Sequence, residues 1–116
     1  MIQQSISIIE ETFDVQSRIM ALFYFFGRKI LLEAMVVEMD KKGYRPADSE
    51  DLQALAKSRP ELQEKFSIIG LSGGSYLPCL DTNLGGERIF VSVPKVAFID
   101  FSVSLSGRCR FAAVLK

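Results

Sequence analysis

The sequence predicts an α+β fold in which N-terminal helices pack on a four- or five-stranded antiparallel sheet formed by the C-terminal half. The apolar positions recur with a helical period before Phe66 and with a period of two after it. Helical and strand patterns are thus segregated along the chain, as in α+β folds. The length of 116 residues suits one domain. We therefore expect a single domain over residues 1–116, helical over 1–65 and with its sheet over 66–116.

The first 26 residues fit two patterns. The apolar residues from Ile2 to Phe13 fall on a helical stripe, whereas residues 5–8 alternate like a strand. We favour a helix here, followed by a second helix that Asp14 caps and that continues to Phe26. The aromatic run at residues 23–26 would point in all directions around that helix, which indicates burial on more than one side.

Three further helices are predicted before the sheet. Residues 28–42 contain good helix formers and end in two lysines, and Gly43 follows where a left-handed residue can end the helix. Asp48 or Ser49 can cap a short helix that runs to about residue 57. Pro60 suits the first position of another helical turn, which we expect to reach about residue 65.

The C-terminal half is predicted to form strands separated by glycine- and proline-containing turns. The turns are expected at residues 72–75, 81–86 and 94–95. The strands are expected at residues 66–71, 76–80, 88–93, 96–104 and 108–115.

The last two predicted strands can be placed in register. Cys109, Phe111, Ala113 and Leu115 share one face, and a three-residue loop at 105–107 pairs Phe111 with Phe101. The opposite face then carries a polar cluster, which we interpret either as an anion-binding site or as a solvated face with a weak ion pair. The candidate ligand- or partner-binding residues are Tyr76, Asp100, Arg108 and Arg110.

The composition excludes several classes of function. The chain has no histidine, which removes the commonest general base and metal ligand, and two cysteines alone cannot form a zinc site. We therefore predict no catalytic residues, no metal and no cofactor. Lys and Arg number 14, as do Asp and Glu, so the net charge favours neither nucleic acid nor an anionic membrane. We expect a cytoplasmic protein with no secretory signal, in which Cys79 and Cys109 are reduced thiols.

The strand patterns carry more apolar surface than one sheet face can bury. Both alternating sets of residues 89–93 are apolar apart from Ser92, which indicates that this part of the sheet is covered on both faces. A second copy of the chain is the simplest cover, because two-fold homodimers are the commonest assemblies. The residues predicted for a dimer interface are Phe90, Val91, Val93, Val96 and Phe98.

These features together predict a non-catalytic binding module that forms a homodimer and recognises a protein partner or an apolar small ligand. Two alternatives stay open. One is a small enzyme that uses carboxylate or tyrosine acid–base chemistry in a pocket between helix and sheet. The other is a small nucleic-acid-binding regulator, although the short helices within residues 49–66 carry more acidic than basic residues.

Overall fold

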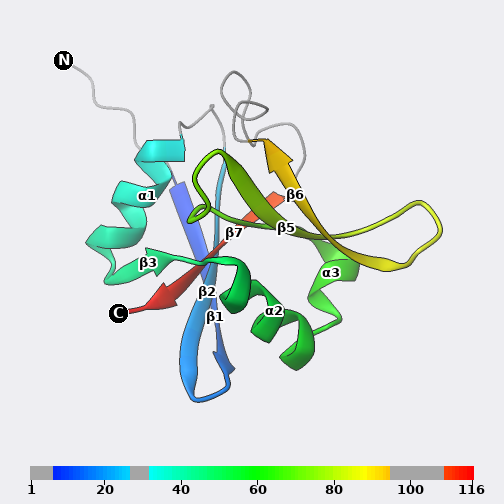
Figure 1. The fold of residues 1–116 in the computed structure, drawn as a ribbon. Coiled ribbons are helices and arrows are strands. Elements are labelled where there is room, and N and C mark those ends of the chain that lie inside the picture. Colours follow the sequence, from blue (N-terminus) through cyan, green and yellow to red (C-terminus); the bar gives the residue numbers. More distant parts are fainter. Residues whose placement is uncertain (1–6, 27–31, 95–108) are drawn as a thin grey trace.

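A computed structural model describes residues 7–26, 32–94 and 109–116 (Figure 1). The described residues form one mixed sheet of seven strands with three helices packed on it. The elements are β1 (Ser7–Val15), β2 (Arg18–Phe26), α1 (Leu32–Lys41), β3 (Tyr44–Pro46), α2 (Ser49–Ser58), α3 (Leu62–Lys65), β4 (Ser67–Gly70), β5 (Tyr76–Thr82), β6 (Arg88–Pro94) and β7 (Cys109–Leu115).

The predicted arrangement of N-terminal helices on a C-terminal antiparallel sheet is wrong. Residues 7–26 form a long antiparallel hairpin, β1–β2, which belongs to the same sheet as the C-terminal strands. The strand order is β1-β2-β7-β4-β5-β6, and β3 pairs with β7 beside this path. The sheet is mixed because β7 runs antiparallel to β2 and parallel to β4.

The turn of the β1–β2 hairpin lacks the residues that usually predict a hairpin from sequence. Gln16 and Ser17 connect Val15 to Arg18, and both have positive φ, 49° and 69°. A two-residue hairpin turn of this kind is normally signalled by asparagine or glycine. Neither residue type occurs at this turn, so no turn signal interrupts the helical spacing of the apolar residues.

Strand β2 accounts for the apolar residues that seemed to surround a helix. Met20 and Leu22 point to one face of the sheet, while Ala21 and Phe23 point to the other, and all four are buried. A central strand covered on both faces needs no polar alternation. Of the aromatic run at residues 23–26, Phe23 is buried as predicted, but in a strand and not in a helix.

Strand β7 lies at the centre of the sheet and has neighbours on both edges. At Phe111 these neighbours are Phe23 of β2 and Ile69 of β4. The predicted pairing of Phe111 with Phe101 is thereby replaced, and the strand predicted at 96–104 lies outside the described residues. Cys109, Phe111 and Ala113 do pack on one face as predicted, whereas Leu115 is exposed.

Strands β3 and β4 share one edge of β7 and meet end to end. Ala47, just after β3, donates its N–H to Ala112 of β7 and accepts from the N–H of Ser72 through its carbonyl. A Cβ on Gly70 would lie 2.6 Å from that Ala47 oxygen, so this close approach requires glycine.

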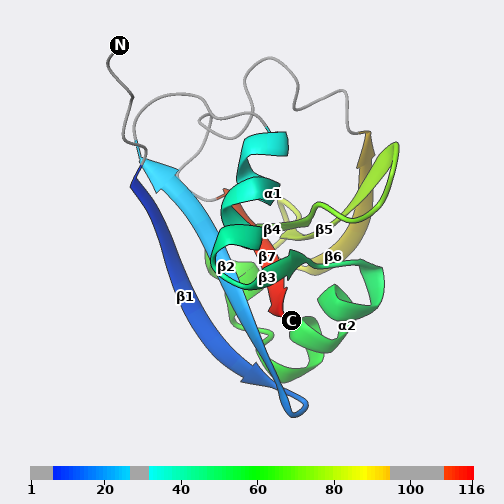
Figure 2. The same cartoon turned by 90° about the vertical axis from the view of Figure 1, so that its left-hand side faces the viewer.

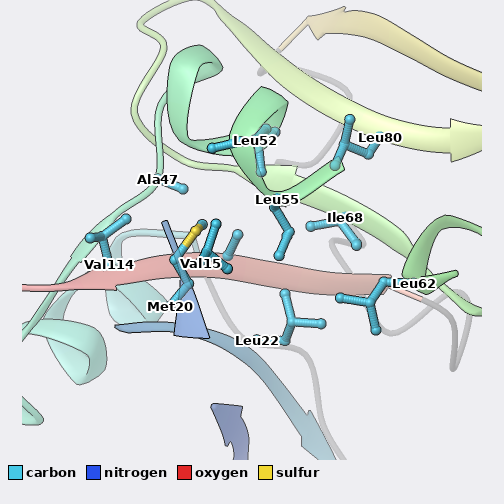
Figure 3. Packing of buried hydrophobic residues seen from close by; sticks show 12 residues of the cluster. Val15, Met20, Leu22, Ala47, Leu52, Leu55, Leu62, Ile68, Leu80 and Val114 are labelled. Atoms are coloured by element: carbon cyan, nitrogen blue, oxygen red, sulfur yellow. The ribbon is translucent and has the colours of Figure 1, made fainter. Parts of the chain in front are cut away.

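The helices cover both faces of the sheet. On one face, Met35 and Met39 of α1 pack with residues that include Phe23 and Phe111. Figure 2 shows α1 in front of the strands, with the curved β1–β2 hairpin at the left. On the other face, α2 and α3 pack over a second apolar cluster, shown in Figure 3.

Several local predictions between residues 43 and 65 are confirmed. Gly43 follows α1 with a φ of 87°. Asp48 caps α2 by accepting a hydrogen bond from the backbone N–H of Asp51 at 2.9 Å. A short helix, α3, follows Pro60. These signals depend on neighbouring residues only, which is why the sequence was sufficient to find them.

Candidate interaction site at the outer strand β6

Strand β6 is the last strand of the sheet and is set in place by a tight turn. Asn83 begins the turn, and its Oδ1 accepts hydrogen bonds from the backbone N–H groups of Gly85 and Glu87, each at 2.9 Å. Gly86 has a φ of 85°, which glycine adopts at low cost. Figure 1 shows the β5–β6 hairpin extending away from the rest of the sheet.

The exposed apolar residues of β6 lie on both of its faces. Phe90 pairs with Leu80 and so faces the side of the sheet that carries α2 and α3. Val91 pairs with Cys79 and faces the side that carries α1. Phe90 is 42% exposed and Val91 is 39% exposed, while Val93 is half-buried against the α1-side cluster. Within one chain Phe90 and Val91 are thus exposed, and the predicted cover of both faces by a second copy stays a prediction.

The buried amide of Gln63 fastens this hairpin to α3. Its Nε2 donates to the carbonyl oxygens of Asp81 at 2.9 Å and Ile89 at 3.1 Å, one on each strand of the hairpin. The hydroxyl of Thr82 donates to the backbone carbonyl of Gln63 at 2.6 Å. Gln63 is only 4% exposed, so these bonds satisfy polar groups that would otherwise be costly to bury.

A second buried polar group, Asp51, bonds to Arg18, the residue that follows the β1–β2 turn. Its carboxylate accepts hydrogen bonds from Arg18 of β2 and Arg45 of β3, both at 2.8 Å, and from the backbone N–H of Asp48 at 3.0 Å. Asp51 is 2% exposed. This cluster joins three elements of the fold, and the sequence did not predict it, because Arg18 lies 33 residues from Asp51 along the chain.

The environment of Asp51 keeps its carboxyl group ionised. Burial raises its pKa, but the hydrogen bonds from Arg45, from the backbone of Asp48 and from Arg18 outweigh burial and lower the pKa to about 2. A carboxyl group with so low a pKa is poorly matched to proton transfer near neutral pH. The same contact with Asp51 raises the pKa of Arg45. This arrangement suits a structural clamp.

The structure separates the two described members of the predicted polar site. Tyr76 is exposed at the start of β5. Arg110 lies in β7 level with Ile68 of β4, and Ile68 in turn pairs with Leu80, four residues along β5 from Tyr76. The other two predicted residues, Asp100 and Arg108, lie outside the described residues, as do Val96 and Phe98 of the predicted interface.

Arg110 is half-buried on the face that carries α2 and α3. Its guanidinium carbon lies 4.3 Å from the centre of the Phe66 ring, and its Nη1 donates to the carbonyl of Cys109 at 3.0 Å. A guanidinium stacked on an aromatic ring is a stabilising arrangement in its own right. The sequence placed Arg110 on the correct face, opposite Cys109 and Phe111, but that face is packed with helices here.

Cys79 is a buried residue of the α1-side cluster. Burial, followed by the charges of Asp81 and Cys109, raises the pKa of its thiol to about 12. A thiol with so high a pKa forms little of the reactive thiolate at neutral pH. Cys79 therefore behaves as a small apolar core residue.

No family model, curated protein or solved structure matches this chain. In the part of the chain that the structure describes, no helix is long and apolar enough to cross a membrane. The same residues hold no group of three or more metal-ligating side chains of the histidine, cysteine or carboxylate type.

Proposed function

We propose that this chain is a non-catalytic interaction module that pairs with a second copy of itself along the outer edge of β6. The observation that carries this proposal is the exposure of two consecutive apolar residues, Phe90 and Val91, on opposite faces of one outer strand. A partner lying flat on one face of the sheet would cover only one of them. A strand added to the edge continues both faces of the sheet and contacts both residues from the side.

The backbone of β6 supports pairing at this edge. The antiparallel ladder with β5 continues into a hydrogen bond from the N–H of Asn83 to the carbonyl of Glu87 at 2.9 Å. Hydrogen-bonded and non-hydrogen-bonded residue pairs alternate along an antiparallel ladder. Counting from Glu87, Ile89 and Val91 therefore bond to β5, whereas Arg88, Phe90 and Ser92 direct their N–H and C=O groups outward. Among the described residues, no strand pairs with this outer edge.

The residues of β6 are compatible with a copy of themselves. In an antiparallel pairing about a two-fold axis at Phe90, Phe90 meets Phe90 of the partner subunit, and Ile89 meets the partner's Val91. Arg88 then faces the partner's Ser92, so like charges do not oppose each other. Pro94, which has no N–H to donate, lies beyond the paired segment.

The proposal is tested by measuring the molar mass in solution by sedimentation equilibrium. We expect a dimer for the natural chain and a monomer for Val91→Lys, because a charge at this position would be buried against the partner strand. The control is Val37→Lys on α1, where the valine is 51% exposed and distant from β6 in sequence. This control is expected to leave the dimer intact.

Amide hydrogen exchange distinguishes edge pairing from other modes of association. In the dimer, the outward amides of Phe90 and Ser92 should become protected as the protein concentration rises. The inward amides of Ile89 and Val91 should be protected at every concentration, because they bond to β5. A monomer at all concentrations, or a dimer that Val91→Lys leaves unchanged, would overturn the proposal.

A further inference from the structure

A groove opens between α2, α3 and β6 on one face of the sheet. Its volume is about 300 Å³, near the lower end of the range typical of small-ligand sites. The lining residues come from four elements and are Gln53, Ala56, Lys57, Gln63, Leu80, Arg88, Ile89 and Phe90.

Part of this lining is apolar, with Phe90 exposed beside the buried Leu80. Leu80 and Phe90 are directly paired on neighbouring strands, so their side chains lie next to each other on the helix-side face. Ala56 adds a small half-buried side chain from α2. Phe90 remains 42% exposed, which leaves aromatic surface available to the apolar part of a ligand.

The charged residues of the groove are both basic. Lys57 and Arg88 are exposed, and neither forms an ion pair with any residue in the described part of the chain. Arg18 and Arg45, by contrast, are each paired with the carboxylate of Asp51. Two cations that pair with no carboxylate of the described residues, beside an apolar wall, complement a ligand that is both anionic and apolar.

The groove is held open by bonds within the protein. The Nε2 of Gln63 binds the carbonyls of Asp81 and Ile89, which fixes α3 against both β5 and β6. The position of α3 relative to β6 is therefore fixed before a ligand binds. A preformed wall lowers the entropic cost of binding.

We propose that this groove binds a small carboxylate with a short hydrocarbon body. Its carboxylate meets Lys57 and Arg88, and its hydrocarbon packs on Ala56 and Phe90, above the buried Leu80. This site goes beyond the proposed self-association, because it uses the helix-side face of β6 and leaves the outer backbone edge free.

The test is a titration of the full chain with octanoate, followed by backbone amide chemical shifts. Octanoate should shift amides of α2, α3 and β6 and bind more tightly than octanol, which lacks the charge, or acetate, which lacks the hydrocarbon. Lys57→Gln and Arg88→Gln should each weaken octanoate binding roughly threefold, as expected for one exposed ion pair. Lys65→Gln, an exposed lysine of α3 outside the groove, should leave the affinity unchanged.

A steric variant and the dimer variant complete the design. Ala56→Leu fills the groove and should abolish binding of octanoate while leaving the molar mass unchanged. Val91→Lys should bind octanoate with normal affinity, so a failure of the self-association proposal is distinguishable from a failure here. Equal affinity for octanol and octanoate, or octanoate binding that survives both charge removals and Ala56→Leu, would overturn the proposal.

Discussion

The two outer strands of the sheet, β1 and β6, differ both in what they expose and in how they are fastened. Strand β1 exposes Glu11, Thr12 and Asp14, and the ring of Phe13 is covered by the guanidinium of Arg59 at 4.7 Å. Charged residues on an outer strand oppose pairing with another chain. Strand β6 has one charged residue, Arg88, at its start, and exposes the apolar Phe90 and Val91 at its centre. One edge is built to stay unpaired, and the other is suited to pairing.

Each outer hairpin is fastened near its turn by one buried polar side chain from the helical segment. Asp51 and Gln63 are the buried polar or charged residues of the described chain. Asp51 holds the β1–β2 hairpin through Arg18, and Gln63 holds the β5–β6 hairpin through two backbone carbonyls. We call these contacts the Asp51 tether, which is ionic, and the Gln63 tether, which joins neutral groups. The two hairpins should therefore respond differently to substitution and to pH.

The largest effect is expected for Asp51→Ala. This change leaves Arg18 and Arg45 without their carboxylate and removes half of the capping box of α2. Breaking a buried ion pair costs about 3–5 kcal/mol. Because both arginines are partly exposed to water, we expect a loss of about 3 kcal/mol in the free energy of unfolding, measured by urea denaturation. Glu50→Ala, an exposed acid in the same helical turn, should change it little. An equal effect of both substitutions would contradict the role assigned to Asp51.

Acid should weaken the Asp51 tether and spare the Gln63 tether. The native pKa of Asp51 is lowered to about 2, so its stabilising contribution is complete above the ordinary pKa of an aspartate. It is lost as the pH falls from about 5 towards 2, by roughly 2 kcal/mol in all. Asp51→Asn should flatten this part of the stability profile, and Gln63→Ala should retain it. A profile that keeps its full acid slope in Asp51→Asn would show that other carboxyl groups dominate.

Gln63→Ala should have a smaller effect than Asp51→Ala. It removes two hydrogen bonds to the carbonyls of Asp81 and Ile89, and each such bond contributes about 0.5–1.5 kcal/mol. We expect a loss of about 1.5 kcal/mol in the free energy of unfolding. Hydrogen exchange should accelerate in β5 and β6 and stay unchanged in β1 and β2. The matched control is Gln53→Ala, an exposed glutamine of α2, and destabilisation by this control as well would refute a specific tether.

The elements of the fold differ in how well the sequence predicts them. The cap at Asp48 and the glycine that ends α1 were predicted correctly, because both depend on adjacent residues. Strands β5, β6 and β7 were found from alternation and turn residues. Strand β2 was not found, because its partner β7 is far away in sequence and its turn lacks glycine.

The candidate site likewise contains features that local sequence predicts and features that only the fold brings together. Phe90 and Val91 were named from the surplus of apolar residues in one strand, and the structure leaves both exposed. Lys57 and Arg88 line one groove because the fold places α2 and β6 on either side of it, which no local pattern encodes. For the same reason, the contact of Asp51 with Arg18 and Arg45 required the topology of the sheet.

The comparison of the two outer strands predicts that β1 will also pair with another chain once its charges are removed. The double variant Glu11→Val and Asp14→Val should form species larger than the dimer, because each chain could then pair at both ends of its sheet. Light scattering at rising protein concentration measures this, and adding Val91→Lys should limit the species to dimers joined through β1. The control, Glu33→Val with Glu64→Val, removes the same charge from exposed helical positions. If this control associates equally, general loss of charge is responsible, and the two edges differ less than their side chains indicate.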